Sequence, residues 1–347
     1  MKDTNLIIGK KNTGKTRGIL FKEVRNAIEN NENLFIYDDR DEYYKTFSKS
    51  LKEKNYNVLT INLKDATKSN GYNPLLLPYL LYKEGKIDEA VSIIDTLALE
   101  IFKEDGNHDP FWENMASNYF TGLTLILFNE ASIDEINLGS IQTMIVQSEL
   151  KYNDTTYLKK YLENINVTNT IYTLLSSIVF APNETKGSII AVTKQKLNRY
   201  LIREQLLNLL NTNDINLKEI NNKTAIFVIG NEKINDLSNI FINQLISIAS
   251  IPFTFIFDNF DSIRKVSSFN ELVKNASYDG NKIYVAIHNE DEFKKTYKNS
   301  IVDQFENIIY LENTSIELEE LGCDFEYPTL EMTKHNYFNF INFIENK

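Results

Sequence analysis

A run of eight residues near the amino terminus has the residue types and the spacing of a phosphate-binding loop. The segment GKKNTGKT at residues 9–16 fits the pattern G-x-x-x-x-G-K-[ST] at every fixed position. An apolar run at residues 6–8 precedes it, and a segment with helical spacing follows at residues 18–28. A strand, a glycine-bearing turn and the start of a helix together direct backbone N–H groups at an anion. The alternative is an ordinary strand-to-helix turn with a spare lysine.

The chemistry of this loop predicts Mg²⁺ and ATP as its ligands. Lys15 would reach the β- and γ-phosphates, and the Thr16 hydroxyl would take a place on Mg²⁺. The residues expected to contact the nucleotide are Gly9, Lys10, Lys11, Asn12, Thr13, Gly14, Lys15, Thr16 and Arg17.

A second apolar run supplies a carboxylate for the metal. Residues 253–257 (FTFIF) read as a buried strand, and Asp258 follows it directly. A phosphate-loop site needs an acid at the end of another buried strand to hold Mg²⁺. We predict that this strand lies next to the strand of the loop, so that Asp258 serves the metal together with Thr16. The alternative is a loop or helix-capping aspartate.

The residue after Asp258 is an amide where ATPases of this general design carry a glutamate that polarises water. Asn259 cannot accept a proton, and losing a general base typically costs about 10²–10⁴ in rate. Asn259 could still orient a water, and Asp261 is a second candidate for the base. His288 follows a further apolar run and is either close to the phosphates or a packing residue. We therefore expect nucleotide binding with slow or absent hydrolysis.

The pattern of apolar runs predicts the elements that position these residues. The predicted strands are residues 6–8, 33–37, 58–63, 225–229, 253–257, 283–287 and 308–311. Segments with helical spacing separate most of them, which favours βαβ units and a predominantly parallel sheet. From residue 78 to about residue 203 nearly every segment has helical spacing. The predicted fold is α/β: a P-loop, RecA-like nucleotide-binding domain interrupted by an all-helical insertion.

The predicted domain boundaries follow from this change of pattern. Residues 1–78 form the first part of the nucleotide-binding domain, and residues 79–205 form the all-α insertion. Residues 206–347 form the second part, with a C-terminal helical tail packed on that domain's surface. The two ends of the insertion are expected to lie close together, because the sheet pattern resumes after it.

Composition limits the class of protein. The chain has 347 residues, and its 42% hydrophobic content suffices for a large core. Its only cysteine, Cys323, excludes an internal disulfide and a Cys-based zinc site. No signal peptide and no window of about 18 apolar residues is present, so we expect a cytoplasmic protein without a membrane span of its own. A net charge of −11 leaves room only for a locally basic surface.

Several segments together resemble the conjugative DNA-transfer coupling proteins of type IV secretion, the TraG type. FIYDDRDEYY at residues 35–44 is similar to that family's strand-plus-DPKGE segment, with Asp38, Arg40 and Glu42 at corresponding places. The other similar segments, in order, are GYNPL at 71–75, DPFWENMA at 109–116, KTAIFVIG at 223–230, DNFDSI at 258–263 and the stretch 288–297. The order of these landmarks and the gaps between them carry the resemblance.

The resemblance implies an ATP-binding component of conjugative DNA transfer. It also implies a homo-oligomeric ring of six around DNA, with the insertion facing a relaxase or other secretion proteins. The family's membrane-anchoring N-terminal segment is not found, so we expect a form that begins at the ATPase domain. Three residues depart from the family pattern: Asn259 replaces the catalytic glutamate, His288 a glutamine thought to sense the γ-phosphate, and Ser277 an arginine. These departures imply slowed or lost turnover.

Two other interpretations stay open. One is a pseudo-ATPase that binds nucleotide for structural or regulatory reasons and serves as a scaffold, without motor activity. The other is a DNA-packaging or translocation motor outside conjugation. Binding of DNA would be non-specific and salt-dependent. The candidate basic surface, whose alternative is a solvated helix face, consists of Lys194, Lys196, Arg199 and Arg203.

Overall fold

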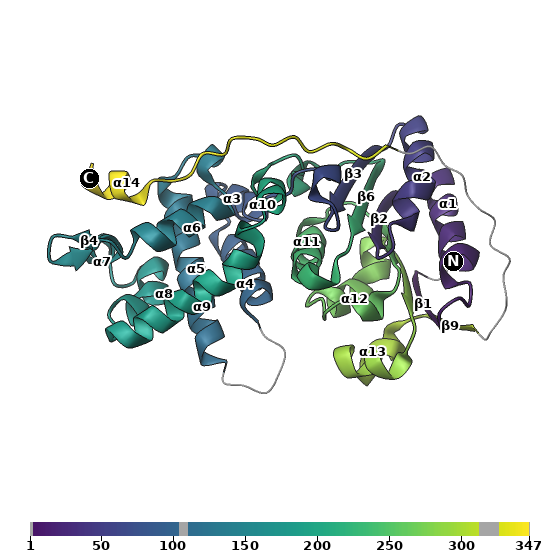
Figure 1. Ribbon diagram of the computed structural model, residues 1–347. Coiled ribbons are helices and arrows are strands. Elements are labelled where there is room, and N and C mark those ends of the chain that lie inside the picture. Colours follow the sequence, from purple (N-terminus) through teal and green to yellow (C-terminus); the bar gives the residue numbers. More distant parts are fainter. Residues whose placement is uncertain (1–2, 104–109, 312–325, 347) are drawn as a thin grey trace. The chain divides into compact units, whose positions relative to one another are not determined.

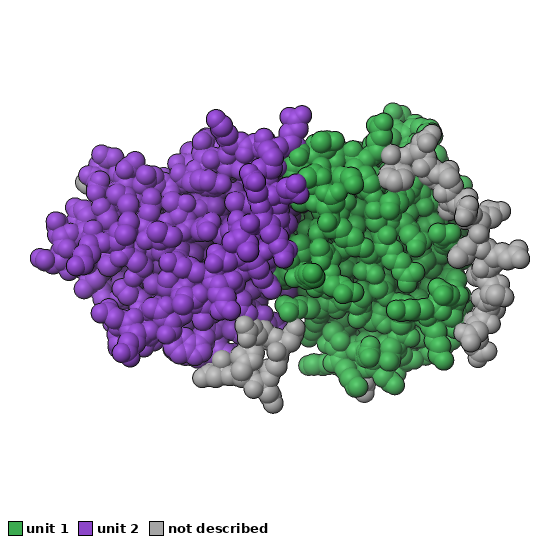
Figure 2. Space-filling model, viewed as in Figure 1, with its two compact units in different colours: residues 1–70, 215–330 green, residues 71–214, 331–347 purple. Residues whose placement is uncertain are grey.

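The computed structural model describes residues 3–103, 110–311 and 326–346, and the chain divides into two compact units (Figures 1 and 2). We call residues Met1–Asn70 and Ile215–Leu330 the sheet unit. Residues Gly71–Asp214 and Glu331–Lys347 form the helical unit. Cys323 lies outside the described residues.

A parallel sheet is the framework of the sheet unit. Among the described residues it has seven strands in the order β3-β6-β2-β7-β8-β1-β9, and every neighbouring pair is parallel. The inner strands are continuous apolar runs because both faces of a parallel sheet are buried. The strands are β1 (Thr4–Gly9), β2 (Asn33–Asp38), β3 (Asn57–Asn62), β6 (Thr224–Ile229), β7 (Phe253–Phe257), β8 (Lys282–Ile287) and β9 (Asn307–Leu311). All seven predicted strands and the α/β fold class are confirmed.

Helices cover both faces of this sheet. On one face Phe21 of α1 (Phe21–Glu29) packs edge-on against Tyr43 of α2 (Glu42–Glu53), with ring centroids 4.8 Å apart. Leu34 and Ile36 of β2 join that cluster, whereas Phe35 points to the other face and stacks on Phe241 of α11. The remaining helical segments are α11 (Asn235–Ile248), α12 (Phe269–Asp279), α13 (Glu290–Tyr297), and the short turns η1 (Lys15–Leu20), η2 (Ala66–Lys68), η4 (Leu217–Glu219), η5 (Glu232–Ile234), η6 (Phe260–Ser262) and η7 (Asn299–Gln304).

The helical unit is built around α5 (Phe111–Glu130), which is buried at every position from Tyr119 to Phe128. Helices α4, α6, α8 and α9 pack against it. A Cβ at Gly122 would lie 2.5 Å from the Leu175 side chain, so glycine permits the close approach of α8. The other elements are α3 (Leu76–Lys83), α4 (Ile87–Phe102), η3 (Ile133–Glu135), α6 (Leu138–Gln147), α7 (Tyr157–Glu163), α8 (Thr170–Val179), α9 (Asn183–Leu201), α10 (Glu204–Asn211) and α14 (Phe340–Glu345).

The insertion is not purely helical. Strands β4 (Lys151–Tyr152) and β5 (Thr155–Thr156) form a two-stranded antiparallel hairpin inside the span predicted to be all helix. The turn between them contains Asn153 at φ 53°, a left-handed conformation that asparagine adopts more readily than most residues. Strands of two residues are too short to produce an alternating apolar pattern, so the sequence gives no sign of them.

The boundaries of the insertion also differ from the prediction. The helical unit begins at Gly71 and continues to Asp214, and α3 and α10 belong to it. Its two ends do meet: the Gly71 N–H donates to the Asp214 carboxylate at 2.7 Å and the Tyr72 N–H to the Leu209 carbonyl at 2.8 Å. The predicted boundaries at residues 78/79 and 205/206 fall inside α3 and α10, because helical spacing does not say to which unit a terminal helix belongs.

The C-terminal segment belongs to the helical unit and not to the nucleotide-binding domain. Residues from Glu331 onward pack with the helical unit, and α14 contacts α6 and α7. Periodicity predicts that a short apolar segment is buried, but it does not say on which surface. No helix among the described residues is long and apolar enough to cross a membrane.

Candidate functional site

The phosphate-loop sequence forms a tight turn between β1 and α1. Asn12 (φ 64°) and Gly14 (φ 87°) have left-handed backbones, which the tight turn requires. A Cβ at Gly9 would lie 2.6 Å from Thr13 Oγ1, so the first glycine permits the loop to fold back on the strand. The helix then begins with the π-turn η1 and continues as α1. The loop therefore has the strand–turn–helix context that the sequence predicts.

Lys15 lies buried beneath this loop. Its ammonium donates to the carbonyl oxygens of Gly9 and Lys10, the second at 2.9 Å. Burial lowers the pKa of Lys15, and Asp258 and Asp261 oppose that effect. A buried cation whose direct partners are carbonyl dipoles is a favourable neighbour for an anion.

Asp258 follows β7 and meets the loop. Its Oδ2 accepts hydrogen bonds from Thr16 Oγ1 at 2.8 Å and from the Tyr43 hydroxyl at 3.2 Å. Burial raises the pKa of Asp258, and the bonds from Thr16 and Tyr43 lower it. One part of the prediction is wrong: β7 is not next to β1, because β8 lies between them. The carboxyl ends of parallel strands share one edge, so Asp258 still reaches Thr16.

Asn259 has a left-handed backbone (φ 55°), and its side chain is hydrogen-bonded to a neighbouring strand end. Its Nδ2 donates to Asp39 Oδ2 at 2.7 Å. Asp39 follows β2, the neighbour of β7, so two strand ends hold this amide in place. No local pattern pairs Asn259 with Asp39, because strand order is not encoded in neighbouring residues.

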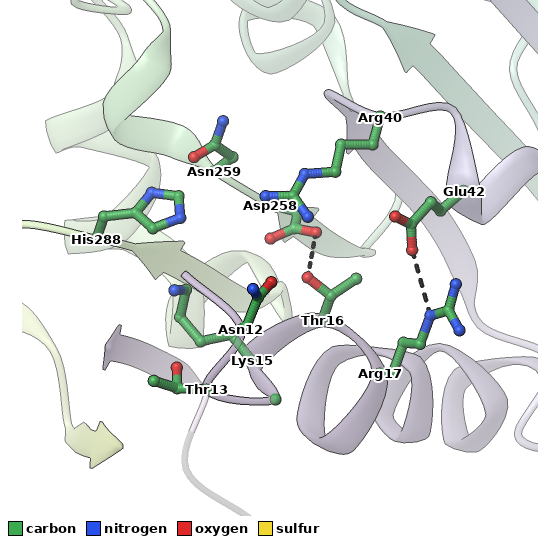
Figure 3. A pocket seen from close by; sticks show the side chains of 11 residues that line it. Asn12, Thr13, Lys15, Thr16, Arg17, Arg40, Glu42, Asp258, Asn259 and His288 are labelled. Carbon is green, nitrogen blue, oxygen red and sulfur yellow. Dashed lines mark hydrogen bonds and ion pairs between the residues drawn. The ribbon is translucent and has the colours of Figure 1, made fainter. Parts of the chain in front are cut away.

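The turn after β2 adds residues that motif analysis alone did not place in the site. Asp38 is fully buried and accepts the backbone N–H groups of Glu42, Tyr43 and Tyr44 at the start of α2. Burial raises its pKa to about 7. This cap fixes the turn from which Arg40 and Glu42 reach the loop (Figure 3). Glu42 accepts a bond from Arg17 Nε at 3.4 Å, and the charge of Arg40 lowers the pKa of Asp258.

These residues enclose a pocket of about 400 Å³ at the carboxyl edge of the sheet (Figure 3). Its lining consists of Asn12, Thr13, Gly14, Lys15, Thr16, Arg17, Arg40, Glu42, Asp258, Asn259 and His288. Of the predicted site residues, Gly9, Lys10, Lys11 and Asp261 do not line it. Ser277 is remote from the pocket. Its hydroxyl donates to Asp3 at 2.8 Å, and Asp3 comes just before β1, at the amino-terminal ends of the strands.

The donor set fits magnesium. Mg²⁺ prefers oxygen ligands and keeps several waters, so a few protein oxygens beside phosphates suffice. Thr16 Oγ1 and the buried Asp258 carboxylate are such oxygens, and they lie within hydrogen-bond distance of each other. Among the described residues no group of three or more His, Cys, Asp or Glu side chains could hold a metal by itself.

The sequence matches a family model described as Type IV secretory system Conjugative DNA transfer over residues 4–252. The chain therefore belongs to the conjugative DNA-transfer family of type IV secretion, as the resemblance of its motifs implied. A comparison with curated proteins finds no match.

Solved structures of coupling proteins share the fold. The bacterial conjugative coupling protein TrwBΔN70 in complex with sulphate superposes with a TM-score of 0.62 at 12% identity, over 89% of this chain and 70% of that chain. TrwB with the non-hydrolysable ATP analogue ADPNP superposes with a TM-score of 0.61 at 12% identity, over 88% of this chain and 70% of that chain. VirB4 of Thermoanaerobacter pseudethanolicus superposes with a TM-score of 0.54 at 10% identity, over 88% of this chain and 76% of that chain.

Proposed function

We propose that this chain binds Mg²⁺–ATP at the pocket around Lys15 and acts as a coupling-protein-like component of conjugative DNA transfer, with slow hydrolysis. The observation that carries the proposal is the meeting of Thr16 and Asp258 beside a buried Lys15. Desolvation destabilises the charged forms of Lys15 and Asp258, and the phosphates and magnesium of a bound nucleotide would offset that cost. TrwB, which shares the fold, has been solved with ADPNP and with ADP and Mg²⁺.

Each residue has a proposed role in this complex. The loop N–H groups and Lys15 hold the phosphates, and Thr16 and Asp258 hold the metal, which neutralises charge on the phosphates. Arg17 and Arg40, which line the same pocket, add positive charge. Asn259 lies where the attacking water would be oriented, and His288 lies at the end of β8 on the same pocket.

Replacing Lys15 by alanine is expected to weaken nucleotide binding by roughly ten- to a hundred-fold. The change removes a charged contact worth about 1.5–3 kcal/mol. Calorimetry with Mg²⁺–ADPNP measures this directly. Lys22→Ala removes an exposed lysine from the neighbouring helix α1 and is the control that should bind normally. Equal affinities for wild type and Lys15→Ala would refute the site.

The alternative of a pseudo-ATPase scaffold has an observation in its favour. The amide of Asn259 is bound to Asp39, so it is held in a fixed orientation without any group at that position that can take a proton. A scaffold would bind nucleotide normally and release no phosphate above the Lys15→Ala background. Phosphate release therefore separates the two candidates.

The basic surface for DNA is better sought on the helical unit's hairpin than along α9. Arg199 is occupied: it donates to the Ile101 carbonyl and the Tyr200 hydroxyl, and its guanidinium lies over the Tyr200 ring. Helix α9 also ends at Leu201, so Arg203 does not continue its surface. By contrast, a hollow of about 610 Å³ beside β4 and β5 is lined by Lys151 and Lys159, with the Phe180 ring at its side. Lys186 and Asp154 also line it, and Lys186 is paired with Glu149 at 2.9 Å.

Binding of DNA is expected to be sequence-independent and to depend on these lysines. On a single strand each phosphate contact contributes about 0.7 to the slope of log K against log salt, so the double variant Lys151→Ala/Lys159→Ala should lower that slope by about 1.4. The control is Lys194→Ala/Arg203→Ala, which removes the same charge from exposed positions elsewhere. Fluorescence anisotropy with a labelled single strand at several salt concentrations measures both. Equal slopes would show that the hollow is not the DNA surface, and no binding at low salt would favour the scaffold.

A further inference from the structure

An aspartate and a histidine form a hydrogen-bonded pair beside the pocket. Asp261 lies in η6, directly after the β7 turn, and its side chain is 6% exposed. One of its oxygens accepts the backbone N–H groups of His288 at 2.7 Å and Asn289 at 3.1 Å. The other lies 3.2 Å from His288 Nδ1. Asp261 is thus held away from the pocket, and it does not act on a pocket water directly.

This contact decides which nitrogen of His288 is available. An ionised carboxylate can only accept, so the neutral imidazole carries its proton on Nδ1 and leaves the lone pair on Nε2. His288 lines the pocket with Lys15 and Asn259, and its ring projects toward the space above Lys15 (Figure 3). No partner for Nε2 is found among the described residues. The free lone pair is therefore on the side of the ring away from Asp261.

We propose that the Asp261–His288 pair supplies the general base that Asn259 cannot, an inference that rests on the Mg²⁺–ATP site proposed above. The water oxygen attacks the γ-phosphorus while the bond from that phosphorus to the β–γ bridging oxygen breaks. The bridging oxygen leaves with the electron pair as part of ADP, and the water proton goes to His288 Nε2. Asp261 accepts the Nδ1–H bond throughout and stabilises the imidazolium until the proton passes to solvent.

The charged groups around His288 come from several elements. The carboxylates are Asp261 in η6, bound to the ring, and Asp258 after β7, and the cations that share the pocket with His288 are Lys15 and Arg40. Glu290 of α13, two residues after His288, forms an ion pair with Lys294 at 2.6 Å and accepts a hydrogen bond from the Tyr310 hydroxyl at 3.0 Å. A general base accepts a proton only in its neutral form, so phosphate release is expected to rise with pH to a plateau.

The test compares pH profiles of phosphate release for wild type and His288→Gln. Glutamine keeps a hydrogen-bonding side chain but cannot serve as a base. We expect the plateau rate to fall by about 10²-fold or more and the rising limb to disappear. His335→Gln makes the same change at a histidine of the helical unit and should leave the profile unchanged. Coincident profiles for wild type and His288→Gln, or a wild-type rate that falls as pH rises, would overturn the proposal.

A second readout does not depend on turnover. Long-range ¹H–¹⁵N spectra of the ¹⁵N-histidine-labelled protein report which ring nitrogen carries the proton. The signals of His288 are those that disappear in His288→Gln, and they should show the Nδ1–H tautomer for the neutral ring. Asp261→Asn should shift that tautomer and lower the rate while Mg²⁺–ADPNP still binds in calorimetry. A neutral His288 with its proton on Nε2 would refute the pair. Loss of nucleotide binding in the wild type would refute the site itself, whereas normal binding with no release above the Lys15→Ala background would refute only the base.

Discussion

Replacing Asn259 by glutamate is expected to accelerate phosphate release, by a part of the roughly 10²–10⁴ that a general base supplies. A carboxylate at this position can accept the proton of the attacking water, which the amide cannot. The gain in the single variant is limited by a neighbour, because Asn259 Nδ2 is bound to Asp39. A glutamate there would face a second carboxylate, and one of the two would tend to hold a proton.

The double variant Asn259→Glu/Asp39→Asn removes this conflict. It exchanges the acceptor and the donor, so that an amide at residue 39 can donate to the new glutamate. We expect the double variant to be faster than the single variant, with Asp39→Asn alone near the wild-type rate. The left-handed backbone of Asn259 costs glutamate about 1 kcal/mol of stability, which denaturant unfolding should record.

The measurement is steady-state phosphate release by these variants and by Lys15→Ala as background. In the Asn259→Glu background, His288→Gln should cost less than it does in the wild type, because two bases at one site are partly redundant. Wild-type release far above background and unchanged in both Asn259 variants would mean that the amide is not a defect. The chain would then be a fully competent ATPase.

The parts of this site that were predictable are those set by neighbouring residues in the chain. The phosphate loop is determined by its own glycines: Gly9 clears Thr13, and Gly14 takes φ 87°. Asp258 could be found because an apolar strand ending in an acid is a local pattern. Each of these features needs only the residues beside it, so a single sequence suffices.

The relations between distant segments were not predictable in the same way. The insertion of β8 between β1 and β7 follows from strand order, which the lengths of apolar runs do not fix. The bond from Asn259 to Asp39 follows from the pairing of β7 with β2. The orientation of Asp261 toward His288 and Asn289 requires that β8 be next to β7. Asp261, a candidate base in the sequence, is bound to His288 and Asn289 in the fold, and we propose that it positions His288.

The C-terminal helix is the other non-local contact, and it predicts a large effect on stability. Phe340 of α14 is fully buried in the helical unit, with its ring centroid 5.9 Å from that of Tyr161, and its N–H donates to Gln147 at 2.8 Å. Phe340→Ala should lower the free energy of unfolding of this unit by about 3–5 kcal/mol, the usual cost of deleting a buried aromatic ring. Phe343→Ala, a half-buried neighbour on the same helix, should cost less.

Denaturant unfolding combined with nucleotide affinity tests where the tail belongs. The two units need not unfold together, so the transition of the helical unit is the one expected to move. Affinity for Mg²⁺–ADPNP should be unchanged in Phe340→Ala under native conditions, because α14 packs on α6 and α7 within the helical unit. Equal effects of the two phenylalanine variants would contradict the burial of Phe340. If Phe340→Ala lowered nucleotide affinity and left the unfolding transition of the helical unit unchanged, the tail would belong to the nucleotide-binding domain, as the sequence alone predicted.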